Sequence, residues 1–195
     1  MAFIQRDGCS EGSTVLHTSL RSVHQDCIPM ASFFVDTCKA SDLVSHDTII
    51  RAASMFGLPS PMVDCPRSRY AGSMVRLGDE SIACSRGVRQ GDPLSTLMFI
   101  SVMDEALSNS VPAPFVTIGG SLMDHLVYAD DSMLFADNAD RLREHLGALS
   151  TLLAAAGMRI NGAKTISLTV LKDGKNKRLI LWPTAYEVNG SVHIL

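Results

Sequence analysis

Two adjacent aspartates, Asp130 and Asp131, lie between two apolar segments, residues 126–128 and 132–136. Each segment is about as long as a short strand, so the pattern predicts a β-hairpin with both acids at its tight turn. Buried strands would hold the two carboxylates side by side, where like charges repel each other and a cation relieves the repulsion. Mg²⁺ takes oxygen ligands of this kind. The hairpin therefore predicts part of a metal site, with a third carboxylate elsewhere in the chain.

Asp36 is the candidate for the third carboxylate. It ends the apolar segment 31–35, which is expected to be a buried strand, and neighbouring strands of one sheet can bring it to Asp130. Two metal ions about 4 Å apart, held by such carboxylates, stabilise the attacking and leaving oxygens in phosphoryl transfer. An acid at a strand end is by itself more often structural. Two of them with a basic loop between them favour a nucleotide site.

The chain between these acids contains a polar, basic and glycine-containing segment, called the basic loop below. It consists of Arg86, Gly87, Val88, Arg89, Gln90, Gly91 and Asp92. The glycines allow a ligand to approach the backbone closely, the arginines can neutralise phosphate, and Gln90 can hydrogen-bond a base or a sugar. Asp92 is expected to cap a helix that begins at Pro93, and the N-terminus of a helix attracts anions.

The elements that must position these residues follow from periodicity and turn signals. Helices are expected at residues 11–25 with Ser13 as N-cap, 42–56, 61–70, 93–107 and 138–156. Strands are expected at residues 31–35, 73–77, 81–85, 166–171 and 178–182 besides the acidic hairpin, and a linker at residues 112–120. This order predicts a single α+β domain, with an antiparallel sheet and helices packed on one face.

The composition argues against several classes of protein. With 46% hydrophobic and 19% charged residues among 195, the chain is globular rather than disordered. Its net charge of −3 argues against a self-sufficient nucleic-acid binder. Five cysteines without a Cys-x-x-Cys pair argue against a disulfide framework and a structural zinc site. No apolar run is long enough to cross a membrane, and no secretory signal is visible.

Four stretches, in this order and spacing, resemble the palm motifs of reverse transcriptases, the RNA-directed DNA polymerases. They are residues 34–46, residues 86–95 with Phe99, residues 128–131, and residues 157–161 with Lys164. Residues 5–9 and 103–105 resemble more narrowly the retrotransposons without long terminal repeats, and among these the elements that insert into ribosomal RNA genes. The similarity runs from about residue 5 to residue 182.

The resemblance implies nucleotidyl transfer from a dNTP to the 3′-hydroxyl of a DNA primer on an RNA template. Asp36 and Asp130 would ligate two Mg²⁺ ions, for which Mn²⁺ is a substitute, and Asp131 would assist as a ligand at the primer end. Lys164 would lie near the pyrophosphate, where a lysine can act as general acid.

The resemblance also implies a set of nucleotide and template contacts. The backbone amides of Thr37 and Cys38 would face the triphosphate. Gln90 and Gly91 would position the templating pair and the incoming nucleotide, and Arg86 would neutralise phosphate.

The chain departs from the family pattern at three places, of which the first bears on activity. Two positions after Lys39 the family has an aromatic residue beneath the nucleotide sugar, whereas this chain has Ser41, which predicts weaker discrimination against ribonucleotides. Ser132 and Met133 replace aliphatic residues after the paired aspartates, and Thr96 replaces a proline.

The resemblance covers a polymerase palm, with fingers and thumb largely absent. Residues 5–171 would form the palm with a remnant of the fingers, and residues 172–195 would begin the primer grip and thumb connection. The other fingers, thumb and endonuclease regions would belong to a longer polyprotein, so the isolated chain is expected to be inactive. The expected partners are an RNA template, a DNA primer and dNTPs, with no membrane, and the expected location is intracellular, in the nucleus.

Four alternatives remain beside this function. The main one is a degenerate retrotransposon fragment that keeps the fold without catalysis, which Ser41 and the missing lobes favour. A domesticated nucleic-acid-binding protein would carry an added basic surface, and another metal-dependent nucleotidyl transferase would lack the second motif. His46 with Ser45 and Asp47 could suggest a hydrolytic triad, but adjacent residues on a helix point in different directions.

Overall fold

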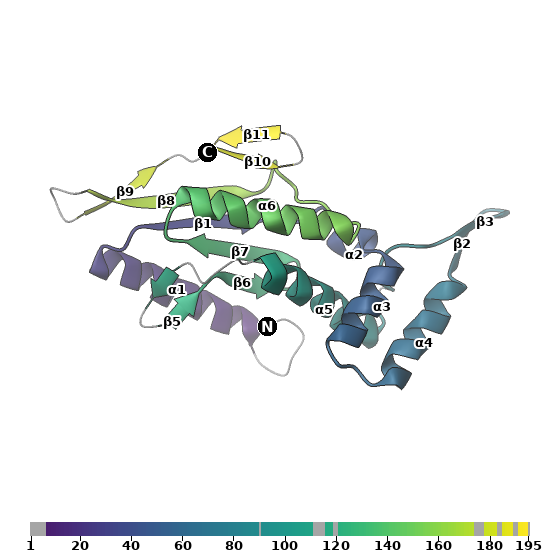
Figure 1. Cartoon of the computed structure of the whole chain (residues 1–195). Helices are drawn as coiled ribbons and strands as arrows, with labels where there is room; N and C mark the ends of the chain where they lie inside the picture. Colours follow the sequence, from purple (N-terminus) through teal and green to yellow (C-terminus); the bar gives the residue numbers. More distant parts are fainter. Residues whose placement is uncertain are drawn as a thin grey trace.

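A five-stranded antiparallel sheet forms the centre of the computed structural model, which describes residues 7–89, 91–110, 116–118, 121–173, 178–182, 185–188 and 191–194 (Figure 1). The strand order is β6-β7-β1-β8-β9, so β1 and β7 are both internal strands. The bounds are β1 Met30–Val35, β6 His125–Tyr128, β7 Asp131–Ala136, β8 Ile166–Asp173 and β9 Arg178–Trp182. The predicted α+β class with an antiparallel sheet is confirmed.

Six described helices and three small hairpins surround this sheet. The helices are α1 Gly8–Asp26, α2 Ala40–Leu43, α3 His46–Met55, α4 Ser60–Ala71, α5 Pro93–Ser110 and α6 Ala139–Ala155. The hairpins are β2 Met74–Leu77 with β3 Glu80–Ala83, β4 Val116–Ile118 with β5 Ser121–Met123, and β10 Ala185–Val188 with β11 Ser191–Ile194. The β2–β3 hairpin extends away from the sheet beyond α4 (Figure 1).

The two faces of the sheet differ because successive side chains of a strand point to opposite sides. Phe33 is fully buried and stands opposite Leu134, whereas its neighbour Phe34 is 38% exposed and stands opposite Met133. Helix α6 packs against β1 and β7, and α5 packs against α6. The buried side chains of α6 are Leu142, His145, Leu146, Leu149 and Leu153, which lie on one face of the helix. Helix α1 lies beside β6 and borders the face that carries Phe34.

The predicted helix over residues 42–56 is wrong in one respect, because it is two helices with a break at residues 44–45. Ser45 has an extended backbone, and its hydroxyl accepts a hydrogen bond from the Thr48 N–H at 3.2 Å, which caps α3. The Ser45 N–H itself donates to the Ala156 carbonyl at 3.0 Å. A contact with a distant segment therefore replaces the helical hydrogen bond that local periodicity predicted.

Two further sequence predictions need correction at the ends of elements. Helix α1 is capped by Asp7, whose Oδ1 accepts from the Ser10 N–H at 3.1 Å, and not by Ser13, which lies inside the helix. The predicted linker over residues 112–120 contains strand β4, which pairs with β5. Residue 171 lies inside β8, so the sheet continues past the predicted end of the palm, and that division stays a prediction.

No helix in the described part of the chain is both long and apolar enough to span a membrane.

Candidate active site

The acidic turn joins β6 to β7. Tyr128 pairs with Asp131, so Ala129 and Asp130 form a two-residue turn, and Asp131 is the first residue of β7. Ala129 has a φ of 57°, in the left-handed region that such tight turns use. The predicted hairpin is confirmed, with Asp130 in its turn and Asp131 at the start of the second strand.

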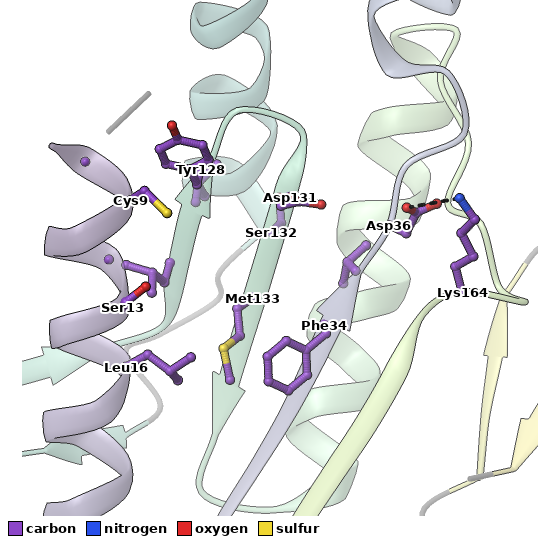
Figure 2. Close-up of a pocket in the computed structure, with 15 residues that line it drawn as sticks. Cys9, Ser13, Leu16, Phe34, Asp36, Tyr128, Asp131, Ser132, Met133 and Lys164 are labelled. Carbon is purple, nitrogen blue, oxygen red and sulfur yellow. Dashed lines mark ion pairs between the residues drawn. The ribbon is translucent and has the colours of Figure 1, made fainter. Parts of the chain in front are cut away.

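Register places Asp36 opposite Asp131. Strands β1 and β7 pair with Val35 opposite Ser132, so the next residues outward on the two strands, Asp36 and Asp131, meet at the same end of the sheet. Figure 2 shows the Asp131 side chain directed toward Asp36 on the neighbouring strand. The three acids Asp36, Asp130 and Asp131 are called the carboxylate edge below.

Electrostatics also connects the three acids of the carboxylate edge. Partial burial, and after it the charges of Asp130 and Asp36, raise the pKa of Asp131 above its ordinary value. The three groups therefore share one negative region that a cation would relieve. Within the described ranges, no three His, Cys, Asp or Glu side chains lie close enough together to hold a metal ion. The predicted metal ligands thus lie at one edge of the sheet, but their side chains are not close enough together to surround an ion.

Lys164 lies on the other side of Asp36 from Asp131. Its Nζ is 4.0 Å from Asp36 Oδ1, and its side chain is mostly exposed (Figure 2). The backbone next to it is anchored to the same residue, since Asn161 donates its N–H to the Asp36 carbonyl at 2.7 Å. The motif of residues 157–161 with Lys164 therefore lies next to the carboxylate edge. The assignment of Lys164 as general acid stays a prediction.

Thr37 and Cys38 continue β1 beyond Asp36 and form an isolated bridge with the segment around Ile160. The Cys38 N–H donates to the Arg159 carbonyl at 2.8 Å, so this amide is already engaged inside the fold. Its predicted contact with a triphosphate would require that bond to break. The Thr37 side chain is 6% exposed, and its hydroxyl has no hydrogen-bond partner in the described part of the chain.

The basic loop is fixed by main-chain contacts with the segment that follows β1. The Gly87 N–H donates to the Val44 carbonyl at 2.8 Å, and the Val88 N–H donates to the Ser41 carbonyl at 2.7 Å. Gly87 has a φ of 86°, and a Cβ there would lie 3.0 Å from the Asp42 carbonyl oxygen. Only glycine combines that conformation with so close an approach.

The site residues predicted in and beside the basic loop differ in how far the structure describes them. Arg86 and Gly91 are exposed, as is Ser41 on α2. Gln90 lies outside the described residues, so nothing bears on its predicted role. Asp92 does cap α5 as predicted, because its Oδ1 accepts from the Leu94 N–H at 3.0 Å.

His46 has a structural explanation that removes the hydrolytic alternative. Its ring stacks on Tyr70 with centroids 4.2 Å apart, and its Nε2 is 3.0 Å from the Gly87 carbonyl oxygen. Ser45 serves as the cap of α3. His46 therefore holds the basic loop in place, and Ser45 is not presented to it as a nucleophile.

One part of the site escaped the sequence analysis. A cavity of about 470 Å³ adjoins the carboxylate edge, and one of its walls is helix α1. The sequence by itself predicts only a helix at residues 11–25. The available signal was the four-residue spacing of small residues, Gly8 with Gly12 and Cys9 with Ser13, which places them on one helix face.

Comparisons with known proteins agree with the motifs. The family model described as "Reverse transcriptase (RNA-dependent DNA polymerase)" matches residues 4–187. The chain is 29% identical over 194 residues to the retrovirus-related Pol polyprotein from the type-2 retrotransposable element R2DM of Drosophila melanogaster. It is 33% identical over 181 residues to a Pol polyprotein from the type-1 retrotransposable element R2 of Popillia japonica.

The coverage of these matches is unequal. The Drosophila match takes in 97% of this chain and 18% of the relative, and the Popillia match takes in 86% and 25%. The chain thus spans a quarter or less of these curated relatives. Among solved structures, apo telomerase from Candida tropicalis, truncated from its C-terminal domain, superposes with a TM-score of 0.52 at 13% identity. That likeness covers 97% of this chain and 40% of the telomerase chain, and it shows a shared fold.

Proposed function

The chain belongs to the reverse transcriptase (RNA-dependent DNA polymerase) family, and we propose that its carboxylate edge is the catalytic site of RNA-directed DNA synthesis. One observation carries the proposal: Asp36 and Asp131 face each other across two internal strands, with Asp130 in the adjoining turn. A family motif at each of these positions gives that geometry its chemical meaning. The substrates would be a dNTP and the 3′-hydroxyl of a DNA primer paired to an RNA template.

The residues of the carboxylate edge fit a pair of divalent cations. All three offer carboxylate oxygens, the ligands preferred by Mg²⁺ and by Mn²⁺. Partial burial, and after it the negative charges of Asp130 and Asp36, raise the pKa of Asp131, and a bound cation would counter both effects. Asp36 and Asp130, assisted by Asp131, would hold the ions, which when bound would stabilise charge on the attacking and leaving oxygens.

Other residues of the chain would position the substrate and move protons. Lys164 reaches Asp36 from the side away from Asp131, which suits a group that donates a proton to the departing pyrophosphate. Arg86 and Gly91 on the exposed surface of the basic loop would meet the incoming nucleotide, together with Gln90. His46 keeps that loop in place through the Gly87 carbonyl.

Ser41 would give the site a loose preference among nucleotide sugars. Its side chain is exposed on α2, while its carbonyl accepts the Val88 N–H, so a backbone hydrogen bond joins α2 to the basic loop. A small hydroxyl cannot form the steric wall that an aromatic ring provides. Replacing Ser41 by Phe should raise the preference for dNTPs over NTPs by about 10–100-fold, the range that pocket shape can supply. Competitive incorporation of a dNTP and its NTP measures this ratio, and an unchanged ratio would contradict the assignment.

The limited coverage of the relatives points to a longer working enzyme. We propose that this chain is the palm of a nuclear retrotransposon polyprotein, whose fingers, thumb and endonuclease regions complete the grip on template and primer. The isolated chain would then have little activity of its own. A degenerate copy that retains only the fold is the competing proposal, and the lack of a closed ligand cluster among the described side chains is the observation that favours it.

Primer extension separates these two proposals. The 195-residue chain, and a version lengthened by the sequence that flanks it in the genome, would be incubated with an RNA template, a DNA primer, dNTPs and Mg²⁺ or Mn²⁺. We expect the longer version to extend the primer, Asp130→Ala to abolish extension, and Asp140→Ala, on the exposed face of α6, to have no effect. Failure of the longer version to extend any primer would leave only the degenerate fragment.

A further inference from the structure

The side chain of Tyr70, in the last turn of α4, connects the two ends of the basic loop. The residue is 6% exposed, and its ring stacks on His46 with centroids 4.2 Å apart. The Nε2 of His46 in turn lies 3.0 Å from the carbonyl oxygen of Gly87, at the beginning of the loop. The Tyr70 hydroxyl is 3.4 Å from Oγ of the buried Ser95, in the first turn of α5 just after the loop. One buried ring therefore contacts the residues that support both ends of the loop.

Two further side chains from this part of the chain contact the middle and the end of the loop. Arg69 places its Nη1 3.1 Å from Oδ2 of Asp92. The other oxygen of Asp92 accepts the Leu94 N–H, so Arg69 orients the carboxylate that caps α5. Ser73, which follows α4, accepts a hydrogen bond at its Oγ from the Arg89 guanidinium at 3.2 Å. The three residues that make these contacts are called the α4 anchor below: Arg69, Tyr70 and Ser73.

The α4 anchor complements the main-chain contacts of the loop. Those contacts lie near the beginning of the loop, where the N–H groups of Gly87 and Val88 donate to the segment after β1. The anchor contacts Arg89 and Asp92, nearer the end, through side chains. Helix α4 itself packs beside α3 and lies away from the strands that carry the carboxylate edge (Figure 1). The anchor can therefore influence the loop without contacting the reacting groups.

We infer that the α4 anchor holds the basic loop in the conformation that binds the incoming nucleotide, with Arg69 and Tyr70 as positioning residues. The inference rests on the proposed function, in which this loop meets the dNTP. A loop that spends less time in its binding conformation binds more weakly in proportion. Loss of an anchor contact should therefore raise the KM for the dNTP. It should leave kcat unchanged, because the carboxylate edge carries the chemical step.

Helix α4 supplies a matched pair of arginines for the test. The side chains of Arg67 and Arg69 are 58% and 55% exposed, and each pairs with one carboxylate. The partner of Arg67 is Asp64 on the same helix, whereas the partner of Arg69 is Asp92 at the end of the loop. Arg69→Gln thus removes a contact with the loop, and Arg67→Gln removes only a contact within α4. Both pairs are exposed, so neither substitution should unfold the chain.

Hydrogen–deuterium exchange of the 195-residue chain measures the loop without any need for catalysis. The amides of Gly87 and Val88 are hydrogen-bonded, so their exchange reports how often the loop opens. We expect Arg69→Gln to speed their exchange about threefold, the scale of an exposed ion pair, and Arg67→Gln to have no effect. Tyr70→Leu, which removes the stacked ring, should speed it about tenfold. Amides of β1 should exchange as in the wild type in the arginine variants, which separates local opening from loss of the fold.

Steady-state primer extension by the lengthened version connects the loop to nucleotide binding. Arg69→Gln should raise the KM for the dNTP about threefold with kcat unchanged, in step with the faster exchange. Arg69→Lys keeps the charge and should restore most of the wild-type KM. Arg67→Gln should change neither constant. A residue that only stabilises the fold would lower the amount of active protein and so lower the apparent kcat instead of raising KM.

The outcomes distinguish failure of the inference from failure of the proposed function. If Asp130-dependent extension is observed but Arg69→Gln leaves both the exchange of the loop and the KM unchanged, the inference is overturned. A fall in kcat at constant KM would overturn it as well. If the lengthened wild type extends no primer, the proposed function fails, and the nucleotide-binding part of the inference fails with it. Faster exchange and a higher KM in Arg69→Gln, with neither change in Arg67→Gln, support the inference.

Discussion

The carboxylate edge and the basic loop are two parts of one proposed site, yet different contacts hold them. Asp36 and Asp131 are positioned by β1 and β7, internal strands whose inward side chains, such as Phe33 and Leu134, are fully buried. The basic loop is held by individual contacts instead: Val88 packs against the edge of the core, and Asp92 pairs with Arg69. Its backbone bonds to the segment after β1, and Gly87 lets the two backbones meet.

This difference shows how each half of the site can fail. The position of the carboxylates depends on core packing several residues away from them. The position of the loop depends on a few individual contacts and on the absence of a Cβ atom at Gly87, where the two backbones meet. Substitutions in the core, in the loop and at the edge can therefore test the two dependences separately.

The packing beneath the carboxylate edge gives the largest effect. Phe33→Ala removes a fully buried ring from the face covered by α6, and we expect it to lower the free energy of unfolding by about 3–5 kcal/mol. Phe34→Ala, on the next residue but on the other face, should cost about 1–2 kcal/mol because its ring is already 38% exposed. Urea denaturation measures both values, and equal losses would contradict the two-faced sheet.

Acid should weaken the layer that supports the sheet. His145 on α6 is fully buried, with its Nε2 3.0 Å from Ser110 Oγ, and burial foremost lowers its pKa to about 4. Since the unfolded side chain has a pKa near 6.5, the unfolded state binds more protons between these values. The stability that neutral His145 contributes should be fully present above pH 6.5. The free energy of unfolding should then fall by about 3 kcal/mol as the pH approaches 4. His145→Gln should show a smaller decrease over that range, and parallel curves for the two proteins would refute the assignment.

The basic loop should respond to a single methyl group. Gly87→Ala forces a Cβ to within 3.0 Å of the Asp42 carbonyl oxygen at a φ of 86°, and we expect a cost of about 2–3 kcal/mol. Gly91→Ala has nearly the same backbone strain, with a φ of 82°, but open space around it, and should cost about 1 kcal/mol. Similar costs for the two variants would mean that the close approach to Asp42 is unimportant.

Charge repulsion at the carboxylate edge gives the smallest effect, and its sign is opposite. Asp131→Asn removes one of three mutually repelling carboxylates, so the variant should be more stable than the wild type by roughly a few tenths of a kcal/mol, the scale of exposed charges. Asp140→Asn removes a carboxylate that pairs with Arg143 and should bring no gain. Thermal unfolding at low ionic strength compares them, and a less stable Asp131→Asn would show that the acids are not in repulsion.

The sequence predicted the carboxylate edge better than it predicted the loops. Strand alternation and turn signals predicted the hairpin, and neighbouring strands do bring Asp36 to this edge. The register places Asp36 opposite Asp131, however, and not opposite Asp130 as the sequence had suggested. The break between α2 and α3 could not be predicted from the sequence. It depends on a hydrogen bond from the Ser45 N–H to the carbonyl of Ala156, a residue more than 100 positions away. Helical periodicity carries no information about such a partner.

The α1 wall was missed for a related physical reason. Gly12 and Ser13 have no chemistry of their own, and their spacing alone indicates only a helix face with small side chains. What gives that face significance is Phe34 and Asp131 across the cavity, and only the folded chain brings them together. Residues with reactive side chains can be predicted from motifs, whereas the walls of a cavity beside them depend on tertiary packing.

Mn²⁺ binding tests most directly the claim that the three acids form one cation site. Electron paramagnetic resonance of Mn²⁺ would be recorded during titration into the wild-type chain, Asp36→Asn, Asp130→Asn and the control Asp140→Asn. Loss of binding in the first two variants, with the wild type and Asp140→Asn binding alike, is the predicted result. Equal binding by all four proteins would show that the carboxylate edge is not the metal site.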